Sequence, residues 1–214
     1  MKKVLCAVLM LAVLLGCACA EETATALWSH EAGWMNFTLA LAQDGLDEVW
    51  EKAAAAFGAS LGLEGLGGAQ LKSMMLQGHV IENSVEDLSI EGDRFTGRKS
   101  DGTELFSREY SLIETIREDG ILGGEAVYVF GTEDADAGEY KYLLITEPQK
   151  AEGEDAAYTT FNLVCTKEDQ YRSIFDMEKS NKAVAVCAMI EKDTSEEGLA
   201  FAIEKLFSNP VIIK

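Results

Sequence analysis

Side chains that could bind a metal ion are few in this chain of 214 residues. There are two histidines, His30 and His79, and the cysteines outside the N-terminal region are Cys165 and Cys187. Zinc is bound in proteins mainly by His and Cys, and carboxylates complete some sites. The spacing of these four residues matches no zinc-finger pattern. We expect His79, which follows a glycine at the end of a predicted helix, to be a surface or capping residue.

An acidic turn is the second place where a cation could bind. Glu133, Asp134 and Asp136 lie in a Gly- and Asp-rich break between apolar runs at 126–129 and 140–145, a pattern that predicts a β-hairpin. The acidic residues lack the twelve-position spacing of an EF-hand calcium loop. No basic residue lies among them to balance their charge. We therefore expect a solvated hairpin tip rather than a calcium site.

The common catalytic motifs are absent from the sequence. It contains no GxGxxG, Walker, GxSxG or HExxH pattern, and neither histidine lies beside a serine or cysteine in a nucleophile motif. The sequence thus provides no set of residues for a catalytic mechanism. We predict a binding protein rather than an enzyme.

The composition favours one acidic globular domain. The formal net charge is −19, and 48% of the residues are hydrophobic, which is enough for a packed core. Binding to nucleic acid needs clustered Lys and Arg, so the charge argues against a nucleic-acid partner. The simplest interpretation of the acidic residues is that they keep the protein soluble.

The first 20 residues are predicted to be a leader. Two lysines precede an apolar run at 4–15, which is too short to span a bilayer. Leu14-Leu15-Gly16-Cys17 resembles a lipobox, which predicts cleavage before Cys17 and its acylation, whereas Ala18-Cys19-Ala20 offers an ordinary cleavage site that would release a soluble chain. We favour the lipoprotein, held on the membrane only by its lipid anchor. In both cases the protein works outside the cytoplasm, as a membrane-anchored lipoprotein or as a secreted or periplasmic protein.

The remaining chain divides into a linker at 21–30 and one domain at 31–214. Apolar periodicity predicts helices at 28–41, 46–57 and 69–77 and a last helix after a capping box at 194–197. Asp44 is expected to cap the second helix and Gly58 to end it. Strands are predicted at 85–90, 94–98, 105–116, 126–129, 140–145, 158–165 and 182–190, and a polar, mobile segment at 148–155.

These elements predict a mainly β fold with helices at both ends of the chain. Short consecutive antiparallel strands hide their edges best by closing into a barrel. The two cysteines of the domain, Cys165 and Cys187, both lie in apolar strand-like runs. Outside the cytoplasm they either form one disulfide or remain two buried thiols.

Several segments together resemble the ZinT (YodA) family. The resemblance is carried by residues 34–41, 44–51, 74–90, 129–142 and 194–207, in the same order and with similar separations. It implies a lipocalin-like (calycin) barrel outside the cytoplasm that binds zinc and passes it to a component of a metal importer.

The family's three metal histidines are missing from this sequence. The first corresponds to Pro148, beside Glu147, and the His-Phe-His motif corresponds to residues 185–187, which end with Cys187. The remaining candidate zinc ligands are Glu147, Cys187, Cys165 and His30. We expect a ZinT-like zinc-binding or zinc-trafficking protein with an altered site. The alternative is a barrel without metal that binds a small apolar ligand or an envelope partner.

Overall fold

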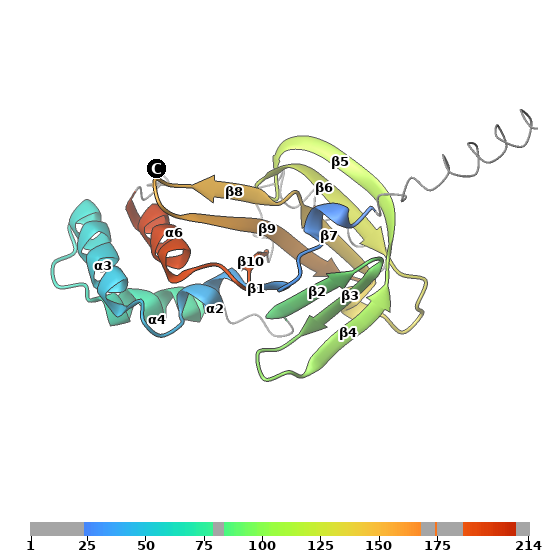
Figure 1. Ribbon diagram of the computed structural model, residues 1–214, viewed down its shortest axis with the longest axis horizontal. Coiled ribbons are helices and arrows are strands. Elements are labelled where there is room, and N and C mark those ends of the chain that lie inside the picture. The colour runs from blue at the N-terminus through green and yellow to red at the C-terminus, as the bar shows by residue number, and fades with distance from the viewer. Residues whose placement is uncertain (1–23, 79–83, 168–173, 175–185, 209–214) are drawn as a thin grey trace, which may run out of the picture.

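The structure is a nearly closed antiparallel barrel with helices packed beside it (Figure 1). It is a computed structural model, and it describes residues 24–78, 84–167, 174 and 186–208. Ten strands within this part of the chain form one sheet in the order β4-β3-β2-β1-β10-β9-β7-β6-β5, and β8 pairs with β9 outside this path. The mainly β, lipocalin-like fold class predicted from the sequence is confirmed.

Helical segments lie near both ends of the described chain, and most of the strands lie between them. The strands are β1 (Trp34–Asn36), β2 (Asp87–Glu91), β3 (Arg94–Arg98), β4 (Glu104–Glu109), β5 (Ser111–Ile121), β6 (Gly124–Gly131), β7 (Tyr142–Thr146), β8 (Gln149–Glu152), β9 (Ala157–Thr166) and β10 (Cys187–Glu191). The helices are η1 (Ala26–Trp28), α2 (Phe37–Leu41), α3 (Asp47–Leu61), α4 (Gly68–Gly78), η2 (Gly138–Tyr140) and α6 (Glu196–Ser208).

The barrel interior is filled by large apolar side chains. Alternate residues of each strand face inward, because successive side chains of a strand point to opposite faces. The buried members of this interior cluster are Trp28, Trp34, Val85, Leu88, Ile90, Phe95, Phe106, Tyr110, Phe130, Leu143, Ile145, Phe161, Leu163, Cys187 and Met189. Trp28, on η1, lies within the stretch assigned to the linker, yet it is fully buried among them. These side chains form the main core of the domain.

A second apolar cluster lies outside the barrel, where α2, α3, α4 and α6 pack together beside β9 and β10. Trp50 and Leu41 are fully buried there, and Tyr158 of β9 contacts the rings of Phe37 and Phe201. Among the described helices, none is both long and apolar enough to cross a membrane.

The predicted helix at 28–41 is wrong over most of its length. Residues 34–36 form β1, which pairs with β2 on one side and β10 on the other. Trp34 and Asn36 face the interior and Met35 is only half-buried, the alternation of a strand. Only residues 37–41 are helical. Pairing with two distant strands overrides the local preference for helix in this segment.

The second helix begins and ends later than the sequence predicted. Its N-cap is Leu46 rather than Asp44, and it runs three residues beyond Gly58. Gly58 is buried inside the helix, where a Cβ would lie 2.7 Å from the carbonyl oxygen of Leu63. The helix ends instead at Gly62, whose φ of 69° is the left-handed conformation that favours glycine. Close packing, rather than helix termination, explains the glycine at 58.

The predicted mobile segment at 148–155 is also wrong, since it contains β8, which pairs with the first half of β9. The other predicted strands are confirmed, and the run at 105–116 is two strands separated at Tyr110. For the last predicted strand, residues 182–185 lie outside the described residues. The last helix begins at Glu196, with the Ser195 hydroxyl accepting from the backbone N–H of Gly198.

Candidate functional site

His30 lies beside two carboxylates that the sequence separates from it by about 160 residues. Its Nε2 is 3.7 Å from an oxygen of Glu191 and 3.7 Å from an oxygen of Asp193. Glu191 is the last residue of β10 and pairs with Trp34 of β1, and the chain then turns so that Asp193 reaches the same imidazole. The three side chains are 27%, 25% and 62% exposed, so the group faces solvent. A histidine nitrogen and carboxylate oxygens are ligand types that zinc accepts, but at these separations the three side chains are not arranged as a metal site.

The other ring nitrogen of His30 is buried. Its Nδ1 has no hydrogen-bond partner among the described residues. The ring lies 5.7 Å from the ring of Trp34, measured between centroids. A histidine that binds metal through Nε2 carries its proton on Nδ1 and usually donates it to a carboxylate or carbonyl. That supporting contact is missing here, which weakens the group as a metal ligand set.

Glu147 lies in a different environment, next to the aromatic residues of η1 and β6. Its carboxylate accepts a hydrogen bond from the Tyr128 hydroxyl. The hydrogen bond to Glu147, together with burial, raises the pKa of Tyr128. The Tyr128 ring contacts Trp28 edge to face, with 4.9 Å between centroids. Glu147 therefore has a structural partner of its own.

Cys187 lies inside the barrel, where its thiol has three polar or sulfur neighbours. Its Sγ accepts from the Asn36 side-chain N–H at 2.9 Å and lies 3.2 Å from the Val85 carbonyl oxygen and 3.7 Å from the Met189 Sδ. Burial raises the pKa of the Cys187 thiol to about 11. Such a thiol is protonated at neutral pH and is not a ready zinc ligand.

Cys165 and Cys187 are both free thiols in the structure. Cys187 pairs with Leu163 across β9 and β10, so Cys165 lies diagonally from it, two residues further along. Diagonal neighbours have Cα atoms about 7–8 Å apart, beyond the usual span of a disulfide. Of the two alternatives left open by the sequence, the structure shows two thiols.

The structure does not bring the predicted zinc ligands Glu147, Cys187 and His30 together. Each has separate partners, and no group of three or more His, Cys, Asp or Glu in the described ranges is arranged to hold a metal ion. His79 lies outside those ranges. Sequence reasoning missed Glu191 and Asp193, whose only signal was a charged turn directly after a strongly apolar strand.

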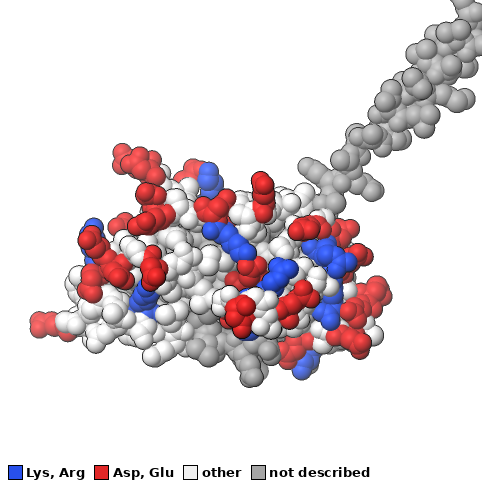
Figure 2. Space-filling model, turned by 60° about the horizontal axis from the view of Figure 1, so that its bottom comes forward, with Lys and Arg blue, Asp and Glu red and all other residues white. Residues whose placement is uncertain are grey.

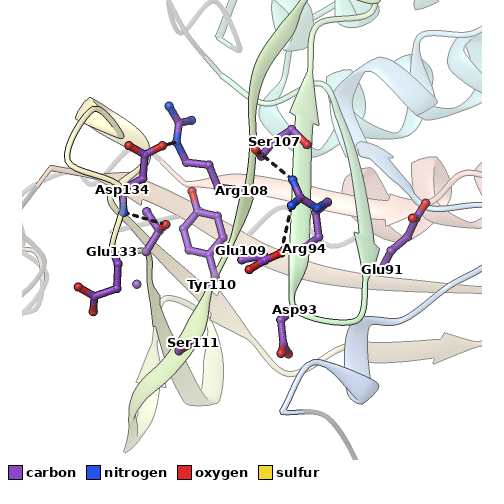
Figure 3. Close-up of a pocket in the computed structure, with 12 residues that line it drawn as sticks. Glu91, Asp93, Arg94, Ser107, Arg108, Glu109, Tyr110, Ser111, Glu133 and Asp134 are labelled. Carbon is purple, nitrogen blue, oxygen red and sulfur yellow. Dashed lines mark hydrogen bonds and ion pairs between the residues drawn. The ribbon is translucent and has the colours of Figure 1, made fainter.

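A polar pocket of about 870 Å³ lies between the β2–β3 turn, β4, the start of β5 and the loop after β6 (Figure 3). Its lining includes five carboxylates and two guanidinium groups. Arg94 lies 3.1 Å from Glu109, and Arg108 lies 2.6 Å from Asp134, so both cations are already paired. On the face seen in Figure 2, acidic side chains likewise outnumber the Lys and Arg among them. The pocket shares its acidity with the rest of the surface.

The acidic turn does have a balancing cation, contrary to the expectation from sequence. Arg108 reaches it from β4, and the Asp134 carboxylate also accepts the backbone N–H of Asp136 at 2.9 Å. These contacts shape the loop itself. The turn is therefore held by internal hydrogen bonds and one ion pair, consistent with a structural hairpin tip.

Acid is expected to loosen this turn through Asp134. The Asp136 N–H and then the Arg108 guanidinium lower the pKa of Asp134 below its usual value. A carboxylate with a lowered folded-state pKa stabilises the fold above its unfolded-state pKa, and this contribution is lost as pH falls through the folded-state value. The protection factors of the amides of residues 132–138, which compare the observed exchange rate with the rate of an unfolded chain at the same pH, should therefore fall at acid pH. In Asp134→Asn protection should be low at both neutral and acid pH, whereas Glu133→Gln, which removes the same charge from the same loop, should keep the loss of protection in acid. An identical response in both variants would contradict the assignment.

The fold defines the class of protein as a lipocalin-like antiparallel barrel with accessory helices. No family model matches the sequence, and no curated protein matches it either. Among solved structures, the chain is similar to the Zn(II)-bound ZinT-like domain of AdcA from Streptococcus pneumoniae, with 16% identity, a TM-score of 0.46 and coverage of 83% of this chain and 88% of that domain. It is also similar to Zn(II)-bound AdcA itself, with 14% identity and a TM-score of 0.48 over 86% of this chain and 35% of AdcA.

Proposed function

We propose that the protein is a ZinT-like, extracytoplasmic metal-binding protein with an altered site, which takes up zinc and delivers it to a component of a metal importer. Three observations support this proposal. They are the N-terminal sequence that predicts a leader with a lipobox-like Cys17, the ordered sequence segments that resemble the ZinT family, and a fold of barrel and accessory helices to which the described parts of those segments belong. Lipidation of Cys17 would keep the protein at the membrane where an importer works.

The single observation that carries the zinc assignment is the position of His30 between Glu191 and Asp193. One Nε2 atom lies 3.7 Å from each carboxylate. Zinc–ligand bonds are about 2.0–2.2 Å long, so the carboxylates must move to close around an ion. Both are partly exposed and belong to the end of β10 and its turn, where side chains can change rotamer without disturbing the core. In this proposal Glu147 and Cys187 are not ligands of that ion.

The proposed site should bind zinc more weakly than a site with complete supporting contacts. Loss of the hydrogen bond to the second nitrogen of a ligating histidine typically lowers metal affinity about 10–100-fold. The buried Nδ1 of His30 lacks that partner. Weak binding suits a protein that must release its ion to another component.

Isothermal titration of the purified protein with zinc tests this function. We expect one zinc ion per chain, with the affinity lowered at least about tenfold by His30→Ala and by the double change Glu191→Gln with Asp193→Asn. His79→Ala is the matched control, because it removes the only other histidine of the sequence. The zinc affinity of this variant should equal that of the unchanged protein. Absence of binding below millimolar zinc, or an equal loss in His79→Ala, would refute the proposed site.

A further inference from the structure

Two sulfur atoms lie in contact inside the barrel, on the strand that ends at Glu191 of the proposed zinc site. Cys187 and Met189 are alternate residues of β10, so both point to the interior face. The Cys187 Sγ and the Met189 Sδ are 3.7 Å apart. Met189 is fully buried and Cys187 is 8% exposed, at the end of the strand. The proposed zinc site uses neither side chain.

We propose that Cys187 and Met189 bind one soft monovalent metal ion, of which Cu(I) is the biological representative. Thiolate and thioether sulfurs are the ligands that select Cu(I) over harder cations. A metal–sulfur bond is about 2.3 Å long, so two sulfurs closer than about 4.6 Å can contact the same ion. The observed separation meets this condition without any movement of the strand. With bonds of about 2.3 Å, this separation corresponds to a bent sulfur–metal–sulfur arrangement.

Charge explains why the ion should be monovalent. One thiolate and one monovalent cation form a neutral pair, whereas zinc with the same two ligands would leave a net positive charge. The site is buried, with Leu163 and Phe161 as the cross-strand partners of Cys187 and Met189, and its polar neighbours are the Asn36 amide and the Val85 carbonyl, to which the thiol donates. An uncompensated charge in such surroundings is costly. This interior site and the group at His30 therefore differ in the ion they accept.

Asn36 supplies the supporting contact that the His30 group lacks. Its side-chain N–H donates to the Cys187 sulfur at 2.9 Å, and its own position is fixed because its Oδ1 caps α2. When the ion binds, the S–H proton is released to solvent, the metal–sulfur bond replaces it, and the Asn36 N–H remains as a hydrogen bond to the coordinated thiolate. Because one proton leaves per ion bound, the apparent affinity should rise about tenfold per pH unit while the thiol is protonated.

Competition between the protein and bicinchoninate for Cu(I), without oxygen, tests the site. We expect one Cu(I) per chain, weakened about 100-fold by Cys187→Ser and about tenfold by Met189→Leu. Cys165→Ser should bind Cu(I) as tightly as the unchanged protein does. Cys165 is not a ligand in this proposal, because a second thiolate would give the complex a negative charge. His30→Ala should also bind normally, and the zinc affinity of Met189→Leu should be unchanged, so failure here is distinguishable from failure of the zinc site.

Met189→Leu also serves as the control for correct folding. Met189→Leu conserves volume and should keep its thermal midpoint, so its weaker binding reports the lost sulfur rather than a damaged core. If Cys187→Ser does not fold, Met189→Leu and the proton released per ion still decide the outcome. Unchanged Cu(I) affinity in Met189→Leu, or a loss in Cys165→Ser as large as in Cys187→Ser, would overturn the assignment.

Discussion

Replacing Trp28 with alanine is expected to lower the free energy of unfolding by about 3–5 kcal/mol. Trp28 is fully buried, and it joins the N-terminal η1 to the barrel interior. Its ring packs edge to face against Tyr128 and Phe130, at 4.9 and 5.6 Å between centroids. Its indole N–H donates to the Thr146 carbonyl oxygen at 2.8 Å. Alanine would leave a cavity, remove one edge-to-face contact from each of Tyr128 and Phe130, and take away the indole donor of a buried carbonyl.

Two further variants separate these contributions in urea unfolding experiments. Trp28→Phe keeps an aromatic ring but loses the N–H, so it should cost about 1–3 kcal/mol, the expense of an unsatisfied buried carbonyl. Leu27→Ala changes the adjacent residue, which is 57% exposed, and should alter stability by less than about 0.5 kcal/mol. A loss below about 1 kcal/mol in Trp28→Ala would show that η1 does not contribute to the barrel core.

The sequence predicted the parts of this fold that local patterns determine. The hairpin of β6 and β7 follows from alternating β-branched and aromatic residues around a Gly-rich turn, and α4 and α6 follow from apolar periodicity. Closure of the strands into a barrel followed from their number and order. In each of these cases neighbours along the chain provide most of the information.

What the sequence could not predict depends on contacts between distant segments. Residues 34–36 carry bulky side chains that fit a helix equally well, and only their pairing with β2 and β10 makes them a strand. The counter-ion of Asp134 is Arg108, which lies 26 positions earlier. Local propensity cannot report such pairings, because the free energy that decides them comes from the assembled sheet.

The residues of the candidate sites also divide into those that the sequence indicates and those that depend on contacts between distant segments. His30 was recognised as a candidate zinc ligand because the chain has only two histidines and histidine is a common ligand of zinc. Glu191 and Asp193 were not recognised, since they are two of 37 acidic residues and nothing nearby distinguishes them. Cys187 was predicted to be a zinc ligand or a disulfide partner, and Met189 was predicted only to belong to the apolar strand at 182–190. Their contact became evident only when the strand was placed with both side chains on the interior face.

Replacing Asn36 with alanine is expected to cost about 2–4 kcal/mol, the second large effect, for a reason unlike that at Trp28. Asn36 is fully buried and uses both ends of its amide. Its Oδ1 accepts from the backbone N–H groups of Thr38 and Leu39, at 3.0 and 3.3 Å, and so caps α2. Its Nδ2 donates to the Cys187 sulfur. Alanine removes the cap and leaves the two partly buried N–H groups of Thr38 and Leu39 without this acceptor.

A double-mutant cycle resolves the two roles of Asn36. The free energies of unfolding of Asn36→Ala, Cys187→Ala and the double variant give the coupling between the amide and the sulfur, which should be about 0.5–1.5 kcal/mol for one hydrogen bond. The remainder of the loss in Asn36→Ala then belongs to the helix cap. If the coupling energy equalled the whole loss of stability in Asn36→Ala, the helix cap would contribute nothing to the free energy of unfolding. In that case α2 would be stabilised by packing alone. Because a single amide joins the start of α2 to the proposed Cu(I) ligand, Asn36→Ala should also weaken Cu(I) binding about tenfold while zinc binding at His30 stays unchanged.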